Sequence, residues 1–417
     1  MVQNTITTSG APEGFDATIV AKEAQNGGAI HIARDSRRLS EMRSALNFFA
    51  PDLPVFTFPA WDCLPYDRVS PNADICADRM AALATFLLDM PKAYVVLTSM
   101  AATTQRVPAR STLRDSVFQA NLNDRVDEKS LRDFLVRMGF VQSPTVMEPG
   151  DYAVRGGIID IFPPGATGPI RLDFFGDTLD GIRTFDPATQ MTKDKLTHLE
   201  LSPVSEIILD EASIRRFRQN YRIEFGASRV EDPLYEAVSA GRKHQGVEHW
   251  LPFFHENLET LFDYLPNASI VLDDQFQAAR TSRWDTISDQ YDTRKTALDQ
   301  QGRMDSVYKP IPPGQMYLDD QAWTEATLNH RMVQLSVLPQ PTGLGVVDAG
   351  AKIGRDFAPE RQNEALSLFG ALSNHIKHHQ ANGPVVITSY SAGSRERLSG
   401  LLSDEGHGEL IEIKDIN

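Results

Sequence analysis

The chain has 417 residues, of which 41% are hydrophobic and 23% charged; this is ordinary for a soluble globular protein with room for roughly three domains. With 41 basic and 56 acidic residues the formal net charge is −15, which argues against a broad surface that follows nucleic-acid phosphates. Two cysteines without metal or redox spacing, no signal-peptide pattern at the start and no apolar run near ~18 residues predict a cytoplasmic protein with no membrane association.

The first part of the chain alternates strand and helix patterns. Strands are predicted at Ala29–Ala33, Val55–Phe58 and Ala93–Thr98. Helices are predicted from a cap at Asp35 or Ser36 to about Phe49, and from about Ile75 to Met90 after Asp74. Strands that alternate with helices imply a mostly parallel sheet.

Between Asn121 and Phe185 the pattern changes to short strands joined by Gly and Pro turns, after a short helix at Lys129–Met138 that ends at Gly139. Period-2 alternation along PIRLDFF (169–175) predicts two different faces. The apolar face carries Ile170, Leu172 and Phe174. The other face carries Arg171, Asp173 and Phe175. An aromatic beside charges is typical of protein interfaces, although a single exposed aromatic needs no partner.

Helix-rich α/β patterns return after Ile207. A buried strand is predicted at Ser269–Asp273, a polar helix at Asp285–Gln301 and a loop at Tyr308–Gly314. The segment QPTGLG (340–345) is interpreted as a linker or domain boundary. A last small α/β unit is expected to contain helices at Phe357–Gln380 and Ser394–Leu402 and strands at Pro384–Ser389 and Glu409–Ile413.

Three blocks of sequence resemble the bacterial transcription-repair coupling factors, whose N-terminal module is related to UvrB of nucleotide excision repair. The first is FPAWDCLPYDRVSPNADICADRMAAL (58–83). The second is PGDYAVRGGIIDIFPPG (149–165) with RLDFFGD (171–177) and IRTFDPATQ (182–190). The third is GVEHWLPFF (246–254) with TLFDYLPNASIVLDD (260–274). The blocks occur in the family's order, which is far more specific than a short motif.

The resemblance implies a fold and its division into domains. The fold would be α/β: a degenerate helicase-like (UvrB-like) α/β domain, interrupted by a small α+β UvrA-binding domain and followed by a second small α/β domain. The expected ranges are 1–119 and 206–335 for the two parts of the UvrB-like domain, 120–205 for the UvrA-binding domain and 336–417 for the last domain.

Nucleotide binding in a helicase-like domain requires the loop G-x-x-x-x-G-K-[ST], whose backbone N–H groups and Lys surround the phosphates. No Gly-Lys pair occurs in the chain. By resemblance the loop should precede the strand at Ala29, where AKEAQNGG (21–28) has two glycines and no following Lys-Ser/Thr. Asp273 and Asp274 lie where a UvrB-type ATPase carries an acidic pair for magnesium. We interpret them as the degenerate remainder of such a site, or as ordinary polar residues at the end of a strand. We therefore expect no enzymatic activity and no cofactor in this chain.

The sequence contains no specific motif for metal binding or for catalysis. His375, His378 and His379 share a helix face, but no carboxylate or Cys accompanies them at ligand spacing, so a solvated surface is the interpretation. No G-x-S-x-G or H-E-x-x-H motif is present.

DNA binding has little support in the sequence. Arg215, Arg216 and Arg218 form a basic run, which is interpreted as a solvated or interdomain helix face. UvrB proteins grip damaged DNA with a long hairpin inserted near the first block, whereas the connection from Tyr66 to Arg79 is short here.

The resemblance also implies a partner. The residues that the family uses to bind UvrA carry over onto Arg155, Arg171 and Phe175. The chain would be the N-terminal part of a coupling factor and recruit UvrA to lesions where RNA polymerase has stalled. In full-length members, RNA polymerase binding and translocation on double-stranded DNA, driven by ATP and magnesium, belong to parts that are absent here.

Two alternatives stay open. One is a UvrB-type damage-binding ATPase, against which the missing phosphate loop and hairpin argue. The other is a structural domain that restrains the rest of the parent protein. This second alternative is compatible with UvrA recruitment, because the docking face can be covered in the intact protein.

Overall fold

The computed structural model of the chain describes residues 5–88, 90–226, 232–301, 308–341, 343–352, 354–363, 366–407 and 410–416. The chain divides into two compact units, Met1–Ala349 and Gly350–Asn417. Within the described residues, no helix has the length and apolar character that crossing a membrane requires.

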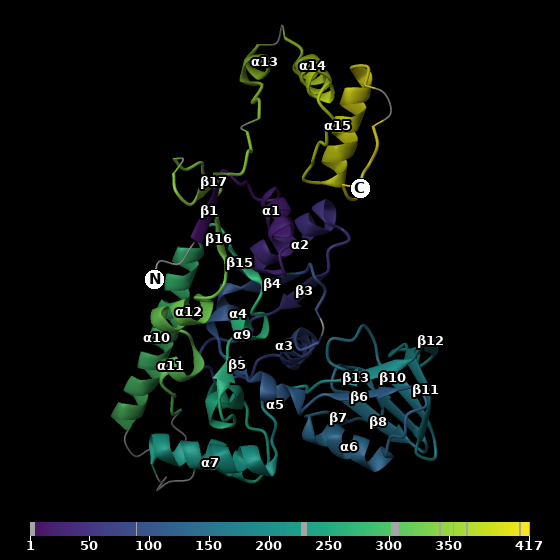
Figure 1. Ribbon diagram of the computed structural model, residues 1–417, viewed down its shortest axis with the longest axis vertical. Helices are drawn as coiled ribbons and strands as arrows, with labels where there is room; N and C mark the ends of the chain where they lie inside the picture. The colour runs from purple at the N-terminus through teal and green to yellow at the C-terminus, as the bar shows by residue number, and fades with distance from the viewer. Residues whose placement is uncertain are drawn as a thin grey trace. The chain divides into compact units, whose positions relative to one another are not determined.

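A parallel sheet forms the centre of the first unit, in the order β17-β1-β16-β15-β2-β4-β3 (Figure 1). Its strands are β1 (Thr5–Ser9), β2 (Ala29–Ala33), β3 (Val55–Phe58), β4 (Val95–Ser99), β15 (Ser269–Leu272), β16 (Met332–Leu335) and β17 (Val346–Asp348). Every pairing is parallel, which confirms the predicted type of sheet. The central strands β2, β4 and β15 are buried along their whole length, as both-face coverage by helices requires.

Helices cover both faces of this sheet. Alternate residues of β2 and β15 face different cores: Ile30 and Ile270 lie in the core with α3 and α9, and Val271 lies in the core with α1 and α2. The first unit has further helices outside the small domain, and of these α7, α8 and η1 pack in a separate core. The helices are α1 (Asp16–Ala24), α2 (Ser36–Phe49), α3 (Ala73–Phe86), α4 (Met100–Thr104), α5 (Arg110–Arg114), α7 (Glu211–Phe225), α8 (Pro233–Ser239), η1 (Val247–Phe253), α9 (Leu261–Tyr264), α10 (Phe276–Gln301), α11 (Pro313–Met316) and α12 (Asp320–Thr327). A short ribbon pairs β5 (Val107–Pro108) with β14 (Leu258–Glu259).

The predicted caps and helix ends are partly confirmed. Asp35 caps α2 by accepting a hydrogen bond from the Arg38 N–H, as predicted. The next helix starts earlier than predicted, because Asn72 rather than Asp74 is its cap. The long helix α10 begins at Phe276 instead of Asp285, and the predicted loop at Tyr308–Gly314 runs into the one-turn helix α11.

The small domain is a six-stranded sheet in the order β12-β11-β10-β9-β8-β7, with the helix α6 (Glu128–Arg137) on one face. Its strands are β7 (Val141–Gln142), β8 (Asp151–Arg155), β9 (Ile158–Ile161), β10 (Ile170–Phe175), β11 (Thr178–Phe185) and β12 (Thr192–Leu196). The chain enters the small domain through β6 (Phe118–Asn121) and leaves it through β13 (His198–Leu201), and these two strands pair with each other. Gly139 follows α6 with φ +89°, which confirms the predicted helix end.

The second unit contains α13 (Ala358–Gln362), α14 (Leu368–Gln380) and α15 (Ala392–Asp404). The predicted helix from Phe357 to Gln380 is thus broken into two. The prediction of a strand at Pro384–Ser389 is wrong, and Leu410–Ile413 is not a strand either; Glu409 lies outside the described residues. A strand pattern is not sufficient here, because neither segment pairs with another strand. The boundary expected at residue 336 stays a prediction, although β17 pairs with β1 and extends the first unit to Ala349.

Candidate functional site

The sheet of the small domain has two different faces, one packed against α6 and one that carries charged side chains above a small buried cluster. On the covered face, side chains of α6 pack against alternate residues of the strands. Ile170 and Leu172 are buried in this core, as the alternation predicted, while Phe174 is half-buried against it. Between Asp173 and Phe174 the pairing with β11 is irregular, because Asp180 is an extra residue in β11.

Two hairpin tips lie side by side at one end of this sheet. Gly156 and Gly157 join β8 to β9, and Gly176 lies in the turn between β10 and β11; Gly156 and Gly176 have φ +63°. The Phe174 N–H donates to the Gly157 carbonyl oxygen at 2.8 Å, which ties the tips together. A Cβ on Gly157 would lie 3.0 Å from the Phe174 oxygen, so this close approach favours glycine.

The tips carry two of the three predicted docking residues. Phe175 is 83% exposed, which confirms that it points away from the core. Arg155 is also exposed, and its Nη2 donates to the Pro144 carbonyl oxygen at 2.6 Å. An exposed aromatic and an exposed guanidinium thus lie at the ends of adjacent hairpins.

Arg171 lies on the predicted face but is mostly covered. Its Nε and Nη2 donate to the two Asp160 carboxylate oxygens at 2.7 and 2.9 Å. The Asp160 side chain is 2% exposed and that of Arg171 is 18% exposed. The guanidinium carbon also lies 4.7 Å from the centre of the Phe185 ring. Hydrogen bonding to Asp160 raises the pKa of Arg171, so this cation is part of a buried ion pair.

The sequence alternation did not single out Arg183, which is the direct cross-strand neighbour of Arg171. Its Nε donates to Asp173 Oδ2 at 3.0 Å, and its side chain is 40% exposed. Gly181 makes this pair possible, because a Cβ there would lie 2.7 Å from the same Asp173 oxygen. Alternation within IRTF could have placed Arg183 outward, but only the strand register places it beside Asp173.

A buried ion pair attaches the end of the small domain to the α/β body. Arg79 of α3 donates to Glu206 Oε1 through Nε at 3.2 Å and Nη2 at 2.9 Å, and both side chains are fully buried. The Trp61 indole donates to Glu206 Oε2 at 2.7 Å. Gly165 of the small domain packs so closely on α3 that a Cβ would lie 2.6 Å from the Ala81 Cβ. The orientation of the docking face is therefore set by specific contacts.

The place that a phosphate loop would occupy is different from the one predicted. Such a loop joins the carboxyl end of a strand to the next helix. In this chain that position is residues 10–15, between β1 and α1. Residues 21–28 are instead the end of α1 and the turn into β2, at the opposite end of the strands. The prediction was wrong because it included neither a strand at Thr5–Ser9 nor a helix at Asp16–Ala24, and therefore placed the start of the sheet at Ala29.

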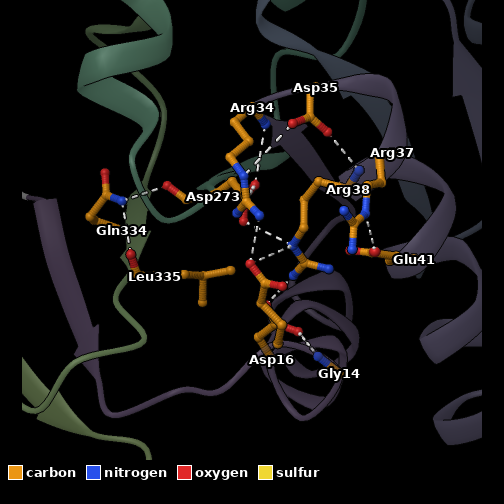
Figure 2. A network of polar contacts seen from close by, with 11 residues as sticks. Gly14, Asp16, Arg34, Asp35, Arg37, Arg38, Glu41, Asp273, Gln334 and Leu335 are labelled. Atoms are coloured by element: carbon orange, nitrogen blue, oxygen red, sulfur yellow. Dashed lines mark hydrogen bonds and ion pairs between the residues drawn. The ribbon is translucent and has the colours of Figure 1, made fainter. Parts of the chain in front are cut away.

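Charged side chains meet at the carboxyl ends of the parallel strands, beside residues 10–15, as Figure 2 shows. Arg38 of α2 contacts the carboxylates of Asp16 and Asp273, with Nε 3.2 Å from Asp273 Oδ1, and all three side chains are buried. The Arg34 N–H donates to Asp273 Oδ2 at 3.2 Å, and Gln334 Nε2 donates to the Asp273 carbonyl oxygen at 2.7 Å. Burial raises the pKa of both Asp16 and Asp273, against the opposing effect of Arg38.

This network places a protein cation between the two acids. Phe15 and Asp16 stand where β1 leads into α1, so neither Lys nor Ser/Thr is available there. Asp273 follows β15, where the resemblance expects an acid that binds magnesium. In the described part of the chain, no group of three or more His, Cys, Asp or Glu side chains is arranged to hold a metal ion. His375 and His379 lie one turn apart on α14, with ring centres 4.5 Å apart.

Comparison with known proteins identifies relatives of both the small domain and the longer chain. The family model described as the UvrB interaction domain matches residues 118–207, from the start of β6 to just past Glu206. The transcription-repair-coupling factor of Escherichia coli (strain K12) is 31% identical over 391 residues, which cover 93% of this chain and 33% of the relative. The protein of the same name from Haemophilus influenzae is 31% identical over 404 residues, covering 94% and 33%. That from Rickettsia prowazekii is 31% identical over 377 residues, covering 90% and 32%. The chain spans about one third of the length of these curated relatives.

Proposed function

Because the chain is homologous to the transcription-repair-coupling factors along more than nine tenths of its length, we propose that it is the N-terminal part of such a factor. Its function in this proposal is to recruit UvrA to lesions where RNA polymerase has stalled. The observation that carries the proposal is a match to the UvrB interaction domain, in which the face opposite α6 carries an exposed aromatic, Phe175.

The docking face is defined by Arg155, Arg171, Phe175 and Arg183, with Phe175 at its most exposed point. Aromatic and Arg side chains dominate the binding energy of protein interfaces, because they combine apolar area with directional hydrogen bonds. Arg155 is available for carboxylates of UvrA, and Arg183 is partly exposed beside its partner Asp173. Arg171 contributes mainly by holding the strands beneath them through its pair with Asp160.

The proposal assigns no ATP hydrolysis to this chain. Arg38 lies between Asp16 and Asp273, where its positive charge would repel magnesium, and the loop at 10–15 lacks the Lys that contacts phosphates. These features support the recruitment function over a UvrB-type damage-binding ATPase. RNA polymerase displacement and ATP-driven movement on double-stranded DNA are assigned to other regions of the longer relatives.

The test is capture of purified UvrA by the immobilised chain, followed by competition with UvrB. If the small domain is equivalent to that of UvrB, free UvrB should release the captured UvrA as its concentration rises. Failure to capture UvrA, with the chain folded by circular dichroism, would overturn the proposal. Capture that UvrB does not reduce would show that the contact lies outside the docking face.

A further inference from the structure

A second charged surface lies on the helix α7, away from the small domain's sheet. Arg215, Arg218 and Arg222, here called the arginine stripe, are all exposed. With Gln219 and Ile223 they line a shallow hollow of about 480 Å³. Ile223 is 73% exposed, so an apolar side chain lies among the three cations.

The three arginines of the stripe lie together on one helix, and none of them forms an ion pair with a described carboxylate. Within the described residues, no carboxylate lies within 4.0 Å of these three guanidiniums. The nearest polar partner is Tyr235, whose hydroxyl accepts from Arg218 Nε at 3.5 Å and whose ring centre lies 5.6 Å from the Arg222 guanidinium carbon. In a chain with 56 acidic and 41 basic residues, such a group is unusual.

Arg216 lies on the same helix but, unlike the stripe, pairs with a carboxylate. Its Nη1 donates to the Phe254 carbonyl oxygen at 2.6 Å and its Nη2 to Glu256 Oε1 at 2.9 Å. The basic run Arg215, Arg216 and Arg218, predicted to be a solvated or interdomain face, is therefore divided. Arg216 has a structural contact, and the other two face solvent together with Arg222.

The helix holds the stripe at a fixed spacing. Phe217 and Tyr221 on its inner face are buried, and Phe217 stacks on Phe254 with ring centres 4.8 Å apart. Positions i, i+3 and i+7 lie on one face of a helix and span about 10 Å along its axis. A partner thus meets three guanidiniums in one row, with little freedom in the backbone that carries them.

We propose that the arginine stripe, with Ile223, is a docking surface for an acidic polypeptide segment that also carries apolar side chains. Charge complementarity requires an acidic partner, and guanidinium forks pair with carboxylates in two parallel hydrogen bonds. The exposed Ile223 favours a polypeptide over a nucleic acid, because phosphates offer it no apolar contact. The net charge of −15 also opposes a long polyanion more than a short acidic segment.

The test uses the full chain and a fluorescent 21-residue helical peptide in which Glu recurs at i, i+3 and i+7 beside Leu. Fluorescence anisotropy should show binding that weakens at least tenfold in the triple variant Arg215→Gln, Arg218→Gln, Arg222→Gln. The matched control is Lys92→Gln, Arg114→Gln, Arg397→Gln, which removes three exposed cations from separate segments and should leave the affinity within about twofold. Thermal melts of both variants establish that each is folded.

Two further arms separate the possible partners. Replacing the peptide's Leu by Ser should weaken binding to the unmodified chain, and Ile223→Ser should abolish that difference. The proposal is overturned if the stripe variant and the control bind the Leu peptide equally. It is also overturned if a 20-base-pair duplex binds more tightly than the peptide and depends on the same arginines, because the surface would then recognise phosphates.

Discussion

At the scale of single residues, exposed and buried cations on the docking face have different roles. Arg171 and Arg183 are direct cross-strand neighbours, yet Arg171 is bound to a carboxylate that is almost fully buried, while Arg183 is more exposed. Alternation along a strand separates its two faces but does not show how deeply each face is covered. Arg171 therefore lies on the predicted face, but a buried carboxylate holds it there.

Replacement of Arg171 should destabilise the chain rather than only weaken docking. Arg171→Ala leaves the Asp160 carboxylate buried without its partner, which we expect to cost about 2–4 kcal/mol of unfolding free energy. Arg183→Ala is the matched control on the next strand and should cost within about 1 kcal/mol. Urea unfolding of both variants measures the difference. Equal destabilisation by the two substitutions would contradict the burial that separates them.

The extent to which the sequence predicts the site is clear from these residues. Period-2 spacing placed Phe175 outward and Leu172 inward, because β-strands alternate by geometry alone. The Asp173–Arg183 pair, the bulge after Asp173 and the Asp160–Arg171 pair all depend on which strands are neighbours. Strand order and register come from long-range pairing, and local spacing contains no information about them.

At the scale of secondary-structure elements, the contact between α3 and the small domain sets the position of the docking face. Arg79→Ala would leave Glu206 buried and unpaired, at a cost of about 3–5 kcal/mol. Arg110→Ala, which breaks a more exposed pair with Glu259, should cost about 1 kcal/mol or less. Chemical denaturation compares them. If Arg79→Ala keeps the full unfolding free energy, Glu206 has another source of stabilisation.

The arrangement of side chains around the loop at 10–15 predicts that the chain does not bind ATP with magnesium. Calorimetric titration of the chain with ATP and magnesium should give no saturable heat up to about 1 mM nucleotide. The reason is that Arg38, Asp16 and Asp273 satisfy one another where a phosphate loop and its magnesium would lie. Magnesium-dependent binding at micromolar concentrations would show that this arrangement opens to accept the nucleotide.

Strand predictions succeeded or failed according to the partners available to each segment. The segments at 29–33 and 55–58 became strands because β4 pairs with both of them. Pro384–Ser389 has an equally apolar, β-branched sequence, but no segment among the described residues of the second unit pairs with it. A strand requires a neighbour to satisfy its backbone hydrogen bonds, and a single-segment pattern cannot supply this information.

At the scale of the whole molecule, buried histidines make stability depend on pH. Burial lowers the pKa of His31 to about 3 and that of His249 to about 4, whereas an unfolded His titrates near 6.5. Below pH 6.5 the unfolded chain therefore binds protons that the folded chain does not. The free energy of unfolding should fall by up to about 1.4 kcal/mol per pH unit for each of these residues between pH 6.5 and 4.

Urea unfolding at pH 7 and pH 5 measures this effect, and His249→Gln should reduce the pH dependence. Asp16 and Asp273 have raised pKa values and act in the opposite direction, so the comparison of His249→Gln with the unmodified chain isolates the contribution of the histidine. Equal unfolding free energies at pH 7 and pH 5 would mean that the buried histidines become charged without unfolding.

The proposed contact between UvrA and the docking face of the small domain is tested most directly by one pair of variants. Phe175 and Val136 are both exposed apolar residues, but Phe175 lies on the docking face and Val136 lies on α6, on the covered side of the sheet. Calorimetric titration of purified UvrA should show that Phe175→Ala weakens binding about thirtyfold, or about 2 kcal/mol, while Val136→Ala has no effect. Both variants should melt within a few degrees of the unmodified chain. Undiminished UvrA affinity in folded Phe175→Ala, or an equal loss in Val136→Ala, would contradict the account.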